Sequence, residues 1–322
     1  MGRITARKRV VRVTVGGSST VSRRDDLLAV EEPLEIRVGG SPLAVTMRTP
    51  GHDVDLAIGY LVSEGVVMSG SDVAGAIHCA NATAKPGADG ANTYNVLDVT
   101  LAPGVTPPSA AIQRDLLMTS ACGVCGKASI DAVRTRSAFA VDDDPVRVAP
   151  ELLVALPGRL RAAQDVFDKT GGLHAAALFD GRTGELLVVR EDVGRHNAVD
   201  KVIGWAAREG LLPLRGLVLQ VSGRASFELV QKASMAGIPV LSAVSAPSSL
   251  AVELANEVGL TLLGFVRDPS LVAYSRPDRL LAASGPLDRD AAADASRSPE
   301  PDAAADASRP HPTRQPETAQ PR

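Results

Sequence analysis

Between Leu217 and Val266, short apolar segments alternate with segments of helical periodicity, and this alternation restricts the fold more than any other feature. The apolar spacing predicts strands at Leu217–Val221, Pro239–Val244 and Leu260–Val266, with helices at Ser226–Ala236 and Ser249–Val258 between them. Strands joined through helices of this length form right-handed β-α-β crossovers and hence parallel pairs. We therefore expect an α/β protein whose mostly parallel sheet is covered by helices.

The preceding residues extend this domain towards the N-terminus. Pro150–Val166 has the periodicity of one long amphipathic helix, and Val193–Arg208 that of another. Between them, His174–Phe179 and Glu185–Arg190 flank Asp180-Gly181, which is typical of paired strands joined by a turn. We place the C-terminal domain at residues 145–284.

Residues 1–115 have a different pattern and predict an α+β N-terminal domain. Gly39-Gly40 separates two short apolar segments and indicates a hairpin, and the helix after it ends at Gly65. An isolated Cys79 beside Ile77 is typical of a small buried apolar side chain. The predicted elements are strands at Arg9–Val15, Leu34–Val38, Leu43–Met47, Ile77–Ala80 and Tyr94–Leu101, and a helix at Asp53–Glu64.

Residues 285–322 predict a disordered tail. Asp290–Arg297 and Asp302–Arg309 are identical, and proline-rich spacers surround them. Too few apolar side chains occur there to offset the entropy of ordering the chain.

Composition excludes several classes of protein. The net charge is -3 and only 3% of residues are aromatic, so we expect no nucleic-acid partner. A membrane-spanning helix needs about 18 consecutive apolar residues, and no segment approaches that length. Met1–Val21 lacks the apolar core of a signal peptide. We expect a cytoplasmic protein without a membrane partner.

Residues 116–144 form a predicted linker that carries Cys122 and Cys125, two of the three cysteines. Glycines follow both, and the predicted helix after Lys127 would place the sulfurs at a helix N-terminus, which favours the reactive thiolate. A zinc half-site or a simple surface turn is the alternative, because one C-x-x-C motif is a weak signal.

Small polar residues and arginines follow the predicted parallel strands, where ligands bind in open α/β sheets. Ser222-Gly223-Arg224, Ser245–Ser249 and Phe265-Val266-Arg267 are these segments. Arg195 and His196 open another predicted helix, within the polar segment Glu191–Asn197. Hydroxyls, arginines and helix N-termini together favour phosphate binding. Helix capping alone could also explain the small polar residues.

Several long motifs occur in an order that resembles the FdhD/NarQ family, the formate dehydrogenase accessory sulfurtransferases. They are Ser120-Ala121-Cys122-Gly123-Val124-Cys125-Gly126, Thr170-Gly171-Gly172-Leu173-His174-Ala175-Ala176, the stretch from Glu191 to Lys201, and Ser222-Gly223-Arg224-Ala225-Ser226. The similarity extends from about Arg23 to Leu280.

The resemblance implies a cytidine-deaminase-like C-terminal domain, a homodimer and a sulfur carrier without a metal of its own. Such a carrier accepts sulfur from a cysteine desulfurase on Cys122, with Cys125 as its companion. It transfers that sulfur to the bis(molybdopterin guanine dinucleotide) molybdenum cofactor of formate dehydrogenase, so GDP should bind as well. The cofactor-contacting segment falls on Phe265, Val266, Arg267, Asp268, Pro269 and Ser270, where relatives commonly carry Gly-Arg and this chain does not. His52 is also at a position that is often acidic in relatives.

Two other functions are alternatives, and the sequence argues against the first of them. A zinc deaminase needs His-x-Glu before Pro-Cys-x-x-Cys, and the sequence contains no His-x-Glu. A cofactor-binding chaperone without sulfur chemistry is the stronger alternative, because binding features are as clear in the sequence as reactive ones.

Overall fold

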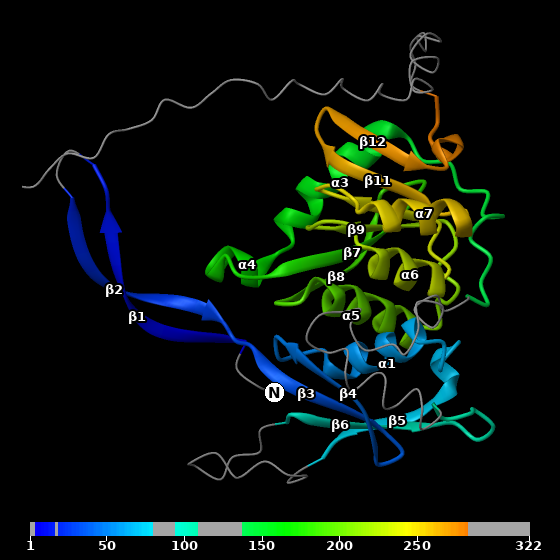
Figure 1. Ribbon diagram of the computed structural model, residues 1–322, viewed down its shortest axis with the longest axis horizontal. Helices are drawn as coiled ribbons and strands as arrows, with labels where there is room; N and C mark the ends of the chain where they lie inside the picture. Colours follow the sequence, from blue (N-terminus) through cyan, green and yellow to red (C-terminus); the bar gives the residue numbers. More distant parts are fainter. Residues whose placement is uncertain (1–3, 17–18, 80–93, 109–136, 283–322) are drawn as a thin grey trace, which may run out of the picture. The chain divides into compact units, whose positions relative to one another are not determined.

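A six-stranded mixed sheet dominates the part of the chain that the computed structural model describes, residues 4–16, 19–79, 94–108 and 137–282 (Figure 1). The strand order is β12-β11-β10-β9-β7-β8. Adjacent strands β9, β10 and β11 are parallel, whereas β7 and β12 run antiparallel to their neighbours. Because β8 pairs antiparallel with β7, it runs in the direction of β9, so most strands share one direction and the predicted α/β fold is confirmed. The strands are β7 (His174–Asp180), β8 (Leu186–Asp192), β9 (Leu217–Val221), β10 (Val240–Ala243), β11 (Thr261–Arg267) and β12 (Ser270–Ser275).

Helices cover both faces of this sheet. Successive strand residues point to opposite faces, so the neighbours of two consecutive residues show which helix lies on each face. Val218 of β9 packs in a cluster with Leu156 of α3, whereas the next residue, Leu219, packs in a cluster with Val202 of α5. The helix α3 (Pro150–Ala162) therefore covers one face. The helices α5 (Arg195–Arg208), α6 (Phe227–Met235) and α7 (Ser249–Val258) contribute to the cluster on the other.

A four-stranded sheet of order β4-β3-β6-β5 packs on the side of α1 (Asp53–Ser63) that faces away from the large sheet (Figure 1). One hydrophobic cluster runs without a break from Leu34 of this sheet through Leu61 of α1 and Val202 of α5 to Leu219 of the large sheet. The strands are β3 (Glu32–Val38), β4 (Ser41–Arg48), β5 (Val73–His78), following the 3₁₀ helix η1 (Gly70–Asp72), and β6 (Val96–Leu101).

Two glycines set the contact between α1 and α5. A Cβ atom added to Gly59 would lie 1.8 Å from the Asp200 carbonyl oxygen, and one added to Gly204 would lie 1.8 Å from the Asp55 carbonyl oxygen. Real side chains cannot come that close, so only glycine allows the helix backbones to touch. We call this contact, together with the buried ion pairs of Asp192 with Lys201 and of Asp200 with Lys232, the α1–α5 seam.

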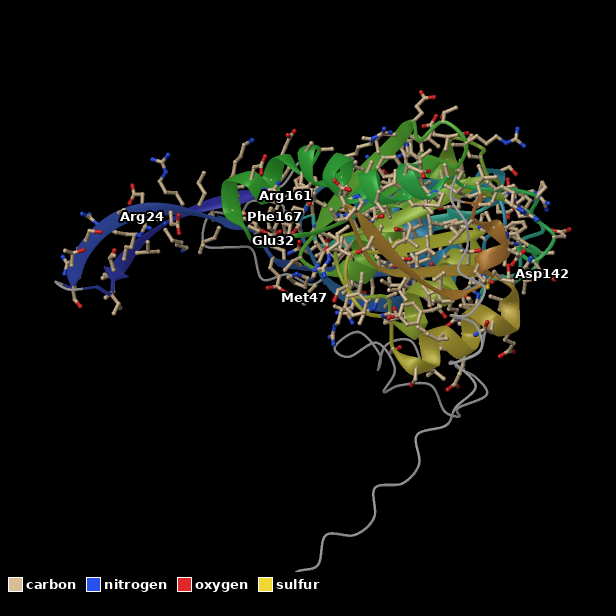
Figure 2. The ribbon with its side chains drawn as sticks, turned by 90° about the horizontal axis from the view of Figure 1, so that it is seen from above. Arg24, Glu32, Met47, Asp142, Arg161 and Phe167 are labelled. Carbon is tan, nitrogen blue, oxygen red and sulfur yellow. The ribbon has the colours of Figure 1, made fainter. Side chains whose placement is uncertain are left out.

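The structure differs from the predicted secondary structure in three places, and Cys79, which was expected to be buried, is half-buried beside an exposed Ile77. A strand β2 (Thr20–Ala29), which the sequence did not predict, pairs along its length with β1 (Thr5–Thr14). Its side chains are mostly exposed, as Arg24 is in Figure 2, so no apolar alternation marks it. The sequence also predicted no strand after Leu260–Val266, but β12 follows β11 and precedes the 3₁₀ helix η3 (Pro277–Arg279).

The third correction concerns the predicted helix at Pro150–Val166, which is two helices. The helix α3 ends at Ala162, and α4 (Asp165–Thr170) begins after Gln164. The Glu191 carboxylate on β8 accepts hydrogen bonds from the N–H groups of Val166 (2.9 Å) and Phe167 (2.8 Å). This contact caps a new helix start, and it comes from a residue that local periodicity does not include.

The two predicted domains share the α1–α5 seam, and the chain up to Ala282 is one compact unit. Within the predicted linker, Val141 and Asp144 are buried. Cys122, Cys125 and the predicted tail lie outside the described residues. None of the helices in the described ranges is both long and apolar enough to cross a membrane.

Candidate functional site

Three predicted segments lie in a row at the carboxyl ends of β9, β10 and β11. The first two are loops, and the third, residues 265–267, is the end of β11 itself. The Ser248 N–H donates to the Ala225 carbonyl (3.0 Å), which joins the first loop to the second. The Phe265 N–H donates to the Ser245 carbonyl (3.3 Å), which joins the second to the third. The structure therefore brings together segments that are up to 43 positions apart, from Ser222 to Phe265. We call this row the loop edge.

The predicted cofactor-binding side chains differ in exposure along the loop edge. Arg224 and Arg267 are exposed, and Phe265 is 41% exposed. Val266 is fully buried in the cluster beneath α3, so its side chain is not accessible to a ligand. Ser222 and Ser245 are half-buried, and the exposed residues Asp268, Pro269 and Ser270 make the turn into β12.

Arg195 and His196 begin α5 next to the first loop. His196 Nε2 lies 3.2 Å from Ser226 Oγ and 3.4 Å from Glu228 Oε2. Burial, with the positive charges of Lys232 and Arg195, lowers the pKa of His196 to about 3, so the imidazole is neutral near pH 7. Arg195 Nε is buried and has no hydrogen-bond partner among the described residues.

Most of the other polar residues of the Glu191–Lys201 motif stabilise the fold. Asp192 and Lys201 form a fully buried ion pair at 2.6 Å, and Lys201 Nζ also donates to the Thr49 carbonyl (2.9 Å). Asp192 further accepts from the N–H groups of Thr49 (3.1 Å) and Gly194 (2.8 Å). Asn197 donates to the Met47 carbonyl (2.7 Å). The motif thus ties the start of α5 to the end of β4.

A second buried ion pair lies deeper on α5. Asp200 accepts hydrogen bonds from Lys232 on α6 (2.8 and 2.9 Å) and from Ser63 Oγ (2.8 Å). Burial alone would lower the pKa of Lys232, but the carboxylates of Asp200 and Glu228 raise it above its usual value. Lys232 therefore stays charged and helps to keep His196 neutral.

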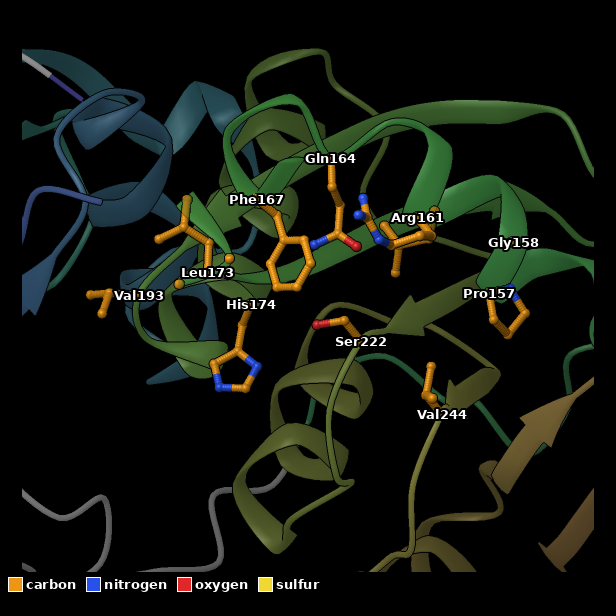
Figure 3. Close-up of a pocket in the computed structure, with 13 residues that line it drawn as sticks. Pro157, Gly158, Arg161, Gln164, Phe167, Leu173, His174, Val193, Ser222 and Val244 are labelled. Atoms are coloured by element: carbon orange, nitrogen blue, oxygen red, sulfur yellow. The ribbon is translucent and has the colours of Figure 1, made fainter. Parts of the chain in front are cut away.

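A pocket of about 710 Å³ lies on the α3 face of the sheet, beside the first loop (Figure 3). Its walls come from α3, α4 and the ends of β7, β9 and β10, and they include Arg161, Gln164, Phe167, Leu173, His174 and Ser222. Only Ser222 of this set was a predicted site residue. Gln164 and Phe167 were not predicted as site residues, because the apolar pattern predicts one helix over Pro150–Val166, with Gln164 inside it and Phe167 beyond its end.

His174 reaches this pocket because β7 is antiparallel to β9. The amino end of β7 therefore meets the carboxyl end of β9, where Ser222 Oγ accepts a hydrogen bond from the Ala175 N–H (2.9 Å). Burial and then the Arg195 charge lower the pKa of His174. The motif Thr170–Ala176 was a signal for this residue, although His174 was not among the predicted site residues.

The roles of Cys122 and Cys125 stay predictions, because both cysteines lie outside the described residues. Within the described ranges, no group of three or more His, Cys, Asp or Glu side chains could hold a metal ion.

Comparison with known proteins assigns the chain to a family. The family model described as "FdhD/NarQ family" matches residues 29–281. A sulfur carrier protein FdhD of Streptomyces avermitilis is 60% identical over 281 residues, which cover 87% of this chain and 97% of that protein. A Mycobacterium tuberculosis protein of the same name is 57% identical over 280 residues, covering 87% and 100%.

A solved structure shows the same fold at lower identity. A Desulfotalea psychrophila protein, proposed to be a formate dehydrogenase accessory protein, superimposes with a TM-score of 0.65 at 20% identity. The match covers 87% of this chain and 100% of that one. From the family match and its curated relatives, the chain belongs to the FdhD/NarQ family.

Proposed function

We propose that this protein is a sulfur carrier that matures formate dehydrogenase. It accepts sulfur from a cysteine desulfurase as a persulfide on Cys122. It then transfers that sulfur to the bis(molybdopterin guanine dinucleotide) molybdenum cofactor before the cofactor enters the dehydrogenase. The observation that carries the proposal is the similarity over nearly the whole length of relatives named sulfur carrier protein FdhD. Location in the cytoplasm and a homodimer are part of the same proposal.

The loading step is a thiol–persulfide exchange. The Cys122 thiolate attacks the terminal sulfur of the desulfurase persulfide, a new S–S bond forms, and the desulfurase cysteine leaves as a thiolate. The oxidation state of the transferred sulfur does not change, so no external oxidant or reductant is required. Cys125 provides a second thiol three positions along the chain.

The loop edge would bind the nucleotide part of the cofactor. Arg224 and Arg267 are exposed there, so two guanidinium groups are available for the two pyrophosphates. Arg195 Nε also has no partner among the described residues, but that atom is buried. His196 is neutral and adds no charge there, so the positive charge comes from the arginines. These features support binding at Ser222, Arg224, Ser245 and the segment Phe265–Ser270.

Intact-mass measurement after incubation with a cysteine desulfurase and cysteine tests the sulfur-carrier proposal. We expect a gain of one sulfur that dithiothreitol removes and that Cys122→Ala abolishes. Cys125→Ala is the matched control, since it removes the neighbouring thiol and should still load. Loading that persists without both cysteines would overturn the assignment. No loading of the intact protein would favour the alternative, a cofactor-binding chaperone without sulfur chemistry.

A further inference from the structure

Gln164 is a buried polar side chain that faces an open pocket. The residue is only 3% exposed, yet its side-chain amide makes no hydrogen bond to any residue in the described ranges. Figure 3 shows the amide projecting from the α3–α4 junction into the pocket that His174 and Ser222 also line. Because the amide faces the pocket and makes no bond within the described residues, its N–H donors and carbonyl acceptor are available to a ligand there. A ligand that pairs with both groups would replace the water that otherwise contacts them.

The surroundings of Gln164 favour a flat ring. The Phe167 ring lines the same pocket, and the Arg161 guanidinium lies over that ring, 4.6 Å from its centroid. Leu173 and Pro157 add further apolar wall. A volume of about 710 Å³ is within the range of small-molecule sites. An aromatic ligand would find stacking and apolar contact here, with one amide to orient it.

We propose that this pocket binds the lactam edge of a fused-ring heterocycle of the guanine or pterin type, with Gln164 as the group that recognises it. A lactam presents an N–H donor beside a carbonyl acceptor, and a carboxamide offers the complementary acceptor and donor, so two hydrogen bonds form together. Guanine and pterin both carry this edge, and both occur in the cofactor of the proposed function, on which this inference rests. Ser222 joins the pocket to the loop edge, where the phosphates of the same molecule would bind.

Direct titration tests the inference with the full-length protein. Pterin binding is measured by quenching of pterin fluorescence, and guanosine binding by calorimetry. We expect Gln164→Leu to weaken binding about tenfold or more, since two neutral hydrogen bonds are lost. Phe167→Leu should also weaken it about tenfold through lost stacking. Gln231→Leu is the matched control, because Gln231 is another buried glutamine (8% exposed) that does not line the pocket.

A second variant keeps the test decisive if Gln164→Leu fails to fold. Gln164→Glu preserves the length of the side chain, and its carboxylate can accept from both the ring N–H and the 2-amino group of guanine or pterin. It should therefore still bind these rings, while it should lose inosine, which has no 2-amino group. Unchanged affinity in Gln164→Leu, or loss of guanine and pterin together with inosine in Gln164→Glu, would overturn the inference.

The two ligands also decide which ring of the cofactor occupies the pocket. A dependence on Gln164 for pterin alone assigns the pocket to the pterin, and a dependence for guanosine alone assigns it to guanine. Sulfur loading of Cys122, measured in parallel, should be normal in every pocket variant. Failure of loading in the unmodified protein would remove the proposed function but not the ring site, whereas normal loading without ring binding would remove only the ring site.

Discussion

The α1–α5 seam and the loop edge are both rich in polar groups, and they treat those groups in opposite ways. At the seam, the ion pair of Asp192 with Lys201 is fully buried and is completed by backbone hydrogen bonds. At the loop edge and its pocket, Arg195 Nε and the Gln164 amide have no partner among the described residues. The comparison separates polar residues that stabilise the fold from those available to a ligand.

One sequence motif supplies both regions. Between Glu191 and Lys201, the residues Asp192, Asn197, Asp200 and Lys201 are buried and paired, whereas Arg195 and His196 face the first loop. Substitutions in the two sets should therefore have different effects. Those in the first set should destabilise the protein, and those in the second should impair binding while the protein stays folded.

The seam should be most sensitive at its closest contact. We expect Gly204→Val to destabilise the protein by about 5 kcal/mol or more, because the new Cβ would lie 1.8 Å from the Asp55 carbonyl and the helices would have to separate. Chemical denaturation measures the free energy of unfolding. Gly158→Ala in α3 is the control, since nothing lies within 4 Å of the added Cβ and the change should be neutral or stabilising by up to about 1 kcal/mol. Equal effects at the two glycines would contradict the close backbone contact.

Breaking the buried ion pair should have the next largest effect. Lys201→Met leaves the Asp192 carboxylate without its countercharge and should cost about 3–5 kcal/mol in the free energy of unfolding. Arg24→Met breaks the exposed pair of Arg24 with Asp26 and should cost less than about 1 kcal/mol. A small loss in Lys201→Met would mean that water reaches Asp192, contrary to its burial.

At the loop edge, Arg267→Ala should reduce binding without unfolding the protein. A charge-assisted contact to phosphate is worth about 1.5–3 kcal/mol, so GDP affinity should fall roughly ten- to a hundredfold. Calorimetric titration measures it, and Arg147→Ala, which removes another exposed arginine, is the control. Unchanged affinity would show that the phosphate lies elsewhere, and no GDP binding to the unmodified protein would remove this part of the proposed function.

The smallest expected effect is the part of the pH dependence of stability that comes from His196. Its pKa is about 3 in the folded protein and about 6.5 when unfolded. As the pH falls from 7 to 5, the unfolded chain gains a proton there and the folded protein does not, so about 1–2 kcal/mol of stability is lost. His196→Gln should remove that part of the acid sensitivity, while His174 and Glu228, which titrate nearby, remain. Parallel pH–stability curves for both proteins would contradict the burial of His196.

The sequence determined those features that local pattern encodes. Strand β9 and helix α7 begin and end at the predicted residues, because apolar periods of about 2 and 3.6 distinguish strand from helix. The positions of Ser222 and Ser245 after two parallel strands, and of Phe265 near the carboxyl end of a third, were also sufficient to predict that these segments meet. Strand β2 was missed because it is exposed on both faces and has no apolar alternation.

Tertiary structure alone decided how the pocket and the seam are built. The new helix start after Gln164 is capped by the Glu191 carboxylate, 27 positions later in the chain, and local periodicity around Gln164 contains no sign of that contact. His174 lies beside Ser222 only because β7 runs antiparallel to β9. Gly59 and Gly204 look like ordinary helix glycines until two backbones meet there. Local periodicity describes which face of an element is apolar, but it does not contain the partners that meet it across the fold.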